Sequence, residues 1–466
     1  MGGLFAALDA SGGALNVYSQ ALGAEQQNVA NASTPGYAVQ NVSIQPLGIP
    51  GNGLPAGDFI QISSPDAAFA DAQVRAASSE ASESQTQAST LSPVNQLFDI
   101  TGTSGILAAL QQFGTAFSSL ATSPNDPALG NAALNAASNV ALAFQSTAGS
   151  LATQETEVDS QIESTVSEIN SLAARISQLN AQASGETEVD PATGASLRST
   201  LDQLSSLVDI NVETNPNGTV SVLAGGQLPL VLGDQAFTLT ADPTAAAGSQ
   251  ITSSGGGNSP QTFSGQLGAL LQVRNGTFGV LLGSGANAGT LNTLTSGFAT
   301  NVNTLLTSGV TATGAAGVPL FTWDQANPHL AAATLAIDPT VTPSALGLAS
   351  TGANGTANGI ANQLAALPAS NAAGDQIGGL SAESYFAAIA ASIGQQLSDA
   401  TNASTTAQTT LTAARNARQQ QIGVSLDQEA VNVTADERAY QASAQVISVL
   451  NNLTLDTVNI LTPTSS

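Results

Sequence analysis

A stretch of 40 residues near the C-terminus constrains the fold most, because it forms a long helical pattern that needs a partner. Residues 422–461 contain no proline and a single glycine, Gly423. Large apolar side chains recur in one heptad register, interrupted at Thr454, and smaller ones follow four residues after most of them. The first set is Leu426, Val433, Tyr440, Ile447 and Leu461, and the second is Ala430, Ala444 and Val458. Spacings that alternate between four and three predict a helix about 60 Å long that packs along a seam.

The beginning of the chain carries a seam of the same period. Leu8, Leu15, Leu22 and Val29 share one heptad register within the stretch that ends near Asn31. Two such helices can bury each other side by side, which would bring both termini to one end of the molecule. Because an isolated helix gains little from packing, we expect both terminal helices to be mobile in the monomer and ordered in an assembly.

The composition excludes several classes of partner. The chain has 466 residues, with 32 acidic residues against seven arginines and no lysine, for a net charge of −25. Nucleic acids and anionic membranes both require clustered cations, so we expect no nucleic-acid partner and no membrane surface. No stretch of about 18 apolar residues predicts membrane insertion, and the N-terminus lacks the pattern of a Sec signal peptide. The absence of cysteine excludes disulfides and thiol chemistry.

The middle of the chain predicts helices interrupted by strands. Asp126 and Pro127 form a strong helix start, and the helical pattern continues to about residue 183 as one rod or as two helices. From Val208 onward apolar and polar residues alternate, which predicts a β-hairpin and a further strand. Further along, the composition predicts a loop at 241–261, helices at 267–273, 291–306 and 383–419, and short strands with turns at 309–378.

These patterns predict a mainly α fold with a β-rich middle insert, in which the long N- and C-terminal helices pair as a coiled coil. Three regions are expected. They are a terminal helical coiled-coil domain (1–45 and 420–466), a helical domain (46–205, 262–309 and 380–419) and a β-rich middle region (206–261 and 310–379).

Few residues could support catalysis. His329 is the only histidine and lies in a turn sequence, and without cysteine no histidine-based metal cluster can form. Glu155, Glu157 and Asp159 are interpreted as surface acids, as are Glu163 and Glu168 on the polar side of a helix. The triplet 255–257 has no following lysine and is no phosphate loop. Trp323 and Phe321 are expected in the core. We therefore expect no enzyme, no cofactor and no metal, with an adhesin or peptidoglycan hydrolase carried in residues 241–378 as the alternative.

Two motifs, one at each end, carry a resemblance to a known family. Residues 28–37 (NVANASTPGY) are similar to the N-terminal signature of flagellar rod, hook and hook-associated proteins. Residues 425–432 (SLDQEAVN) and 440–447 (YQASAQVI) resemble the C-terminal signature of the hook-associated protein 1 family. The similarity covers most of the chain and is weakest at 241–260 and 350–378. The chain departs from the family at Ala38 and Val39, where a basic residue is common, and at Asn275.

The resemblance implies a structural subunit of the bacterial flagellum with a flagellin-like helical domain behind its terminal helices. It implies a ring of subunits at the hook–filament junction, in contact with the hook protein and with the next hook-associated protein or filament subunits. It also implies a cytosolic export chaperone at the C-terminal helix, type III export and an extracellular location. Another axial subunit (hook, rod or filament) is the nearer alternative, against which residues 426–429 argue. The expected assembly interface comprises Leu8, Leu15, Leu22, Val29, Pro35, Gly36, Tyr37, Leu426, Val433, Tyr440, Ile447 and Leu461.

Overall fold

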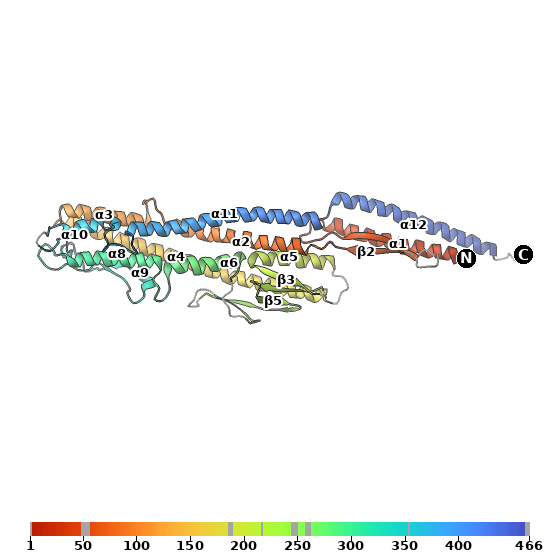
Figure 1. Cartoon of the computed structure of the whole chain (residues 1–466), viewed down its shortest axis with the longest axis horizontal. Helices are drawn as coiled ribbons and strands as arrows, with labels where there is room; N and C mark the ends of the chain where they lie inside the picture. Colours follow the sequence, from red (N-terminus) through yellow and green to blue (C-terminus); the bar gives the residue numbers. More distant parts are fainter. Residues whose placement is uncertain are drawn as a thin grey trace.

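The structure is a computed structural model that describes residues 2–47, 56–184, 190–215, 218–243, 250–256, 262–352 and 355–461. These residues form a long, narrow rod of helices with both ends of the chain at the same tip (Figure 1). Helices α1 (Gly2–Asn31) and α12 (Leu426–Leu461) lie side by side at that tip. The prediction that the two ends of the chain meet is thus confirmed.

The rod consists of helices that are distant in sequence. Helices α2 (Ala68–Gln96) and α11 (Ala382–Ile422) lie together along much of its length, and α3 (Gly105–Thr122) and α4 (Pro127–Ala183) continue it. The buried contact between α2 and α11 consists of three alanines and two larger residues. The alanines are Ala77, Ala81 and Ala407, and the larger residues are Val74 and Leu411. Alanine-lined helices approach each other closely, as the alanine-rich composition favours.

Helix α4 is a single rod of 57 residues, which settles the choice that the sequence left open. The Asp126 side chain accepts a hydrogen bond from the Ala128 amide at 2.8 Å, and Pro127 occupies the first turn, as predicted. Buried residues recur every three or four positions from Ala133 to Ala183, so one continuous face packs against the core. Helix α5 (Pro191–Leu207) starts in the same way, with Asp190 as its cap.

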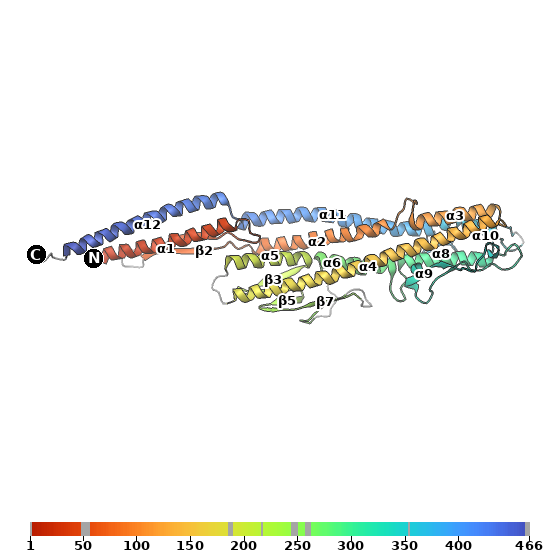
Figure 2. The same ribbon diagram turned by 180° about the vertical axis from the view of Figure 1, so that it is seen from behind.

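Strands lie against α4 on the side of the rod opposite α11 (Figure 2). The predicted hairpin and third strand are confirmed as part of a four-stranded antiparallel sheet in the order β3-β4-β5-β6. Asn180 of α4 fastens this sheet, because its amide group donates to the Val220 and Gly233 carbonyls and accepts from the Val220 amide. The strands are β3 (Ile210–Thr214), β4 (Val220–Ala224), β5 (Leu228–Leu232) and β6 (Gln235–Ala236).

The prediction of a loop at 241–261 is wrong where the structure describes these residues. Strands β7 (Leu239–Asp242) and β8 (Gln250–Ser253) pair there, while 244–249 and 257–261 lie outside the described residues. Asn170 of α4 holds the first strand by bonding both the amide and the carbonyl of Leu239. Only Leu239 and Ile251 are buried in this pair, too few apolar residues to predict strands.

The far end of the rod differs from its prediction as well. The predicted helices are confirmed as α6 (Gly265–Gln272) and α8 (Gly289–Ser308). Residues 309–378 were predicted as short strands and turns; their described part is mostly turns and loops, but it also holds short helices that were not predicted, and its two strands have two residues each. The elements that follow α6 are the π-helical η1 (Val273–Phe278), α7 (Gly279–Leu282), β9 (Phe321–Thr322), η2 (Pro328–Leu330), α9 (Ala331–Thr334), β10 (Ala336–Ile337), η3 (Pro343–Ala345), α10 (Gly359–Ala366) and η4 (Leu367–Ala369). Packed rings of Phe113, Phe117, Phe298 and Phe321 form their core.

The terminal pair joins the rod at a break in the last helical stretch. The unbroken helix predicted from Ile422 stops at that residue, and Gly423, Val424 and Ser425 are non-helical before α12 begins. Beside α1 lies a hairpin of β1 (Asn41–Leu47) and β2 (Ala56–Ser63). Within the described residues, no helix is both long enough and apolar enough to cross a bilayer.

Candidate functional site

The two terminal helices form the candidate site, and the face of α12 toward α1 follows the predicted register only in part. Val433, Tyr440 and Ile447 are partly buried on this face, as predicted. The second line of the face lies at Asp436, Ser443 and Leu450, three residues after these rather than four. Consequently Ala430 is exposed and Ala444 is only partly buried. Leu426 is 55% exposed, and the side chains of Val458 and Leu461 lie outside the described part.

On α1 the predicted period is present but its phase is displaced by two residues. The line of deepest burial consists of small and polar side chains: Val17, Ala21, Ala24 and Asn28. Leu8, Leu15 and Leu22 are partly buried on the flank of this line, and Val29 is 45% exposed. Small residues at the centre let the two helices approach closely, while the leucines close the edge of the contact.

The outer side of α12 carries an aliphatic stripe that the chain leaves uncovered. Val446, Val449 and Leu453 are 48–58% exposed and follow one another at spacings of three and four. Val431 and Leu455 on the same helix are 64% and 57% exposed. A row of exposed aliphatic side chains along one helix marks a surface that another protein can cover.

The N-terminal signature closes the turn between α1 and the hairpin. Asn28 is completely buried, and its amide donates to the Gln40 carbonyl at 2.9 Å and to Glu429 Oε2 at 3.1 Å. Its Oδ1 accepts from the Tyr37 hydroxyl at 3.0 Å and from the Gln40 amide at 2.9 Å. Tyr37 is buried inside the chain, and burial raises the pKa of its phenol. The motif therefore links α1, the turn and α12 through one side chain.

Gly36 is the contact between this turn and the rod. Its φ of +79° lies in the left-handed region, and a Cβ placed there would stand 2.4 Å from the Ala195 carbonyl oxygen of α5. Only glycine meets both requirements. The Gly36 carbonyl accepts a hydrogen bond from Arg198 of α5, whereas Pro35 is exposed.

A group of charged side chains fixes the rod side of the joint. Asp71 of α2 lies between Arg198, at 2.9 Å, and Arg418 of α11, at 3.3 Å. Arg418 also pairs with Asp202 of α5 at 2.7 Å. Burial raises the pKa of Asp202 and lowers that of Arg75, which faces the same carboxylates. Sequence reasoning missed this group, because its members lie on three separate helices.

Three carboxyl groups meet at the α1–α12 contact, and sequence reasoning missed them too. Glu25 is 3% exposed and Glu429 4% exposed, and Asp436 lies beside them. Burial, the charge of Asp436 and a hydrogen bond to it raise the pKa of Glu25 to about 7, with Glu429 adding to the effect. Burial and the neighbouring carboxylates therefore favour the protonated form of Glu25.

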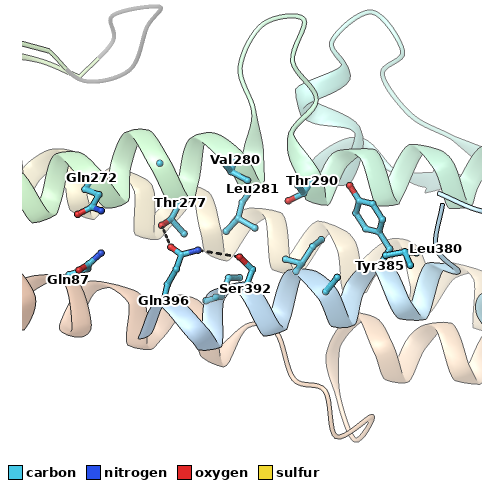
Figure 3. Close-up of a pocket in the computed structure, with 14 residues that line it drawn as sticks. Gln87, Gln272, Thr277, Val280, Leu281, Thr290, Leu380, Tyr385, Ser392 and Gln396 are labelled. Carbon is cyan, nitrogen blue, oxygen red and sulfur yellow. Dashed lines mark hydrogen bonds between the residues drawn. The ribbon is translucent and has the colours of Figure 1, made fainter. Parts of the chain in front are cut away.

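A pocket in the rod is lined by uncharged residues. It measures about 500 Å³ and lies between α11 and the η1–α7 segment, with Gln87 of α2 at its edge. Figure 3 shows Thr277, Gln396 and Ser392 in one hydrogen-bonded row along its wall. Gln272 and Thr290 add further uncharged polar groups, the other lining residues are mostly apolar, and Tyr385 is the one titratable residue among them. Such a wall can bind an uncharged group but cannot transfer a proton at neutral pH.

The residues considered for chemistry have structural contacts. His329 Nδ1 lies 2.8 Å from the Gly285 carbonyl in a short turn, as predicted. Glu155 and Asp159 were predicted to be surface acids, but both are partly buried and pair with Arg274 at 2.8 and 2.7 Å. Phe321 is buried, and Trp323 packs against the core. Among the described residues, no group of three or more acids and histidines could hold a metal ion.

Comparisons of the sequence and of the fold with known proteins all find similarity to flagellar hook-associated proteins. The helical-domain model of flagellar hook-associated protein FlgK matches residues 91–321. Flagellar hook-associated protein 1 of Escherichia coli is 28% identical over 326 residues, which cover 66% of this chain and 58% of that protein. Flagellar hook-associated protein 1 of Salmonella typhimurium is also 28% identical over 326 residues, which cover 57% of its length. Both matches therefore span less than two thirds of the relative.

Two further relatives cover more of their own length. Flagellar hook-associated protein 1 of Bacillus subtilis is 26% identical over 98% of both chains. The structure of the flagellar hook junction protein FlgK from Burkholderia pseudomallei has the same fold, with a TM-score of 0.63 at 16% identity over 75% of this chain and 99% of that one. The helical-domain match, the end-to-end similarity and the shared fold together make the chain similar to flagellar hook-associated protein 1.

Proposed function

We propose that the chain is a structural subunit of the bacterial flagellum that joins the hook to the filament and has no enzymatic activity. The observation that carries the proposal is the uncovered aliphatic stripe of α12 beside α1, at the tip where both termini lie. The names of its relatives, hook-associated and hook junction proteins, supply the location.

In this proposal the terminal helices pair as a coiled coil, and subunits associate through them into a ring. One end of the ring contacts the hook protein, and the other contacts the next hook-associated protein or filament subunits. The exposed members of the predicted interface, Val29, Pro35 and Leu426, contact neighbours directly. The partly buried Leu8, Leu15, Leu22, Val433, Tyr440 and Ile447, with Leu461, hold the pair, while Gly36 and Tyr37 set its angle to the rod.

Before assembly, the same stripe needs protection in the cell. An amphipathic helix with an uncovered apolar face is what helix-in-groove recognition takes up. We therefore propose that a cytosolic export chaperone binds α12 and that the chain leaves through the flagellar type III channel. The division into a terminal, a helical and a strand-containing region belongs to the same proposal.

Complementation tests the proposal. A host that lacks its own hook-associated protein 1 should regain filaments when it expresses the full chain. Val449→Asp with Leu453→Asp should abolish filaments, because two charges on the stripe block burial against a neighbour. The matched control places the same charges at exposed polar positions of the same helix, Asn451→Asp with Asn452→Asp, and should keep filaments. Equal loss in both variants, or normal filaments in the first, would contradict the role of the stripe.

A further inference from the structure

A groove at the joint end of the terminal pair has an acidic lining that its own chain does not neutralise. It measures about 590 Å³ and lies between α1, the start of β1 and α12. Glu25, Glu429 and Asp436 all line it. Glu25 is 97% buried, and its Oε2 has no hydrogen-bond partner among the described residues. Buried carboxylates are normally paired with a cation, so this groove is incomplete as it stands.

The cation that would complete the groove is an organic one. The described residues contain no metal-binding group, whereas a guanidinium offers a planar fork of donors for two or three carboxylates at once. The groove has room for such a side chain. Ionising Glu25 without a partner is costly, as its pKa of about 7 indicates, and an entering cation would remove that cost.

The terminal region contains one cation, and it is not among the residues that line the groove. Arg438 is the only basic residue in 1–45 and 420–466. It follows Asp436 by two positions, which is about 200° around a helix, so the two side chains lie on nearly opposite sides of α12. Arg438 is exposed and forms no ion pair within the described residues. Its helical neighbours three and four positions away are Thr434, Ala435, Gln441 and Ala442, none of them acidic.

We propose that Arg438 of one copy enters the groove of Glu25, Glu429 and Asp436 on the next copy. The inference rests on the proposed self-assembly and names the contact that would direct it. Because Arg438 and Asp436 point to nearly opposite sides of the same helix, each copy offers Arg438 to one neighbour and Asp436 with its groove to the other. Such a head-to-tail contact repeats around a ring or along a helix and cannot stop at a dimer.

Disulfide trapping tests the contact directly, since the chain has no cysteine of its own. Gln428 lines the groove, and Gln441 lies one turn after Arg438. The double variant Gln428→Cys, Gln441→Cys should give a ladder of cross-linked multimers when flagella are oxidised and denatured. The control Gln428→Cys, Thr412→Cys places the second thiol on α11 and should give no ladder. Filaments at the normal number without a ladder from the first variant would overturn the contact.

Charge variants test what holds the contact. Arg438→Gln should lower the number of filaments at least about tenfold, as loss of a desolvated ion pair does, and Arg438→Lys should restore part of it. Asp436→Arg fills the groove from within its own chain, so it should protect the α1–α12 pair while also lowering filament number. Normal filaments with both Arg438→Gln and Asp436→Arg would overturn the proposal.

The failure of the contact and the failure of the proposed function give different results. If the unmodified chain restores filaments while the trapping and charge results are negative, only the groove contact is wrong. If the unmodified chain restores none, the proposed function is wrong. The same cross-link on the concentrated purified chain then decides the contact alone, since a ladder there supports it and monomers overturn it.

Discussion

Replacing Glu25 with glutamine should remove a pH dependence from the pairing of α1 and α12. In the folded chain burial, Asp436 and Glu429 raise the pKa of Glu25 from 4.5 to about 7. When the pair opens, the side chain returns to water and to its ordinary pKa. Between these two values the closed pair binds a proton that the open pair has released, so closing becomes less favourable as the pH rises.

The size of the effect follows from the shift. The free energy of opening should fall by about 1.4 kcal/mol per pH unit from about pH 4.5 to about pH 7, and level off above that. Over the whole window the loss is at most about 3 kcal/mol. Burial raises the pKa of Asp436 as well, which acts in the same direction.

Hydrogen exchange of the backbone amides measures this opening. Protection of residues 17–28 and 429–443, corrected for the intrinsic exchange rate, should fall up to about 100-fold from pH 5 to pH 7. Helix α4 serves as the internal reference. Glu25→Gln should flatten the dependence and keep protection high at pH 7, whereas Glu437→Gln, an exposed neighbour on α12, should leave it unchanged. A flat profile in the unmodified chain, or an unchanged slope in Glu25→Gln, would refute the reasoning.

Three other substitutions test the joint and the register of the pair. Gly36→Ala should destabilise the joint by about 2–4 kcal/mol, because it combines backbone strain with steric overlap on α5. Gly23→Ala, with open space around it, should not destabilise the joint, and limited proteolysis there distinguishes the two variants. Arg418→Gln should lower stability by about 1–3 kcal/mol by leaving Asp202 without its cation, and Arg415→Gln, exposed on the same helix, should have little effect in denaturant unfolding. Val17→Asp should lower the free energy of α1–α12 pairing, measured by hydrogen exchange, by about 3 kcal/mol, against about 1 kcal/mol for Leu15→Asp. Equal losses in the two variants would contradict the observed phase of burial on α1.

The sequence predicted the period of the terminal helices but not their phase. Leu15 and Leu22 are among the large apolar residues of α1 and dominate any count of hydrophobic positions, yet the most deeply buried residues of this helix include Ala21, Ala24 and Asn28. Close helix packing favours small side chains at its centre, and hydrophobicity alone gives these little weight. Predictions that rest on local chemistry fared better, as the start of α4 at Asp126 and Pro127 shows.

The joint could not have been predicted from one sequence. Residues 28–37 were recognised as a motif, but the role of Asn28 depends on Gln40 and on Glu429, which is 401 positions away. Asp71, Arg198 and Arg418 likewise come together only once α2, α5 and α11 are packed. Strands β7 and β8 were missed for a similar reason, since side chains of α4 rather than their own pattern hold them in place.

The meeting of the two chain ends at one tip has a kinetic consequence. Asn28 of α1 and Glu429 of α12 are 401 positions apart, so the contact between the two helices closes a long loop. Loop closure costs entropy before it gains any contact, and non-local pairings of this kind form late and slowly. The α2–α11 pair closes a smaller loop inside it. The α1–α12 pair should therefore form last, after the rod has folded. A chain whose synthesis or transport is incomplete then has a folded rod but no terminal helix pair with which to associate.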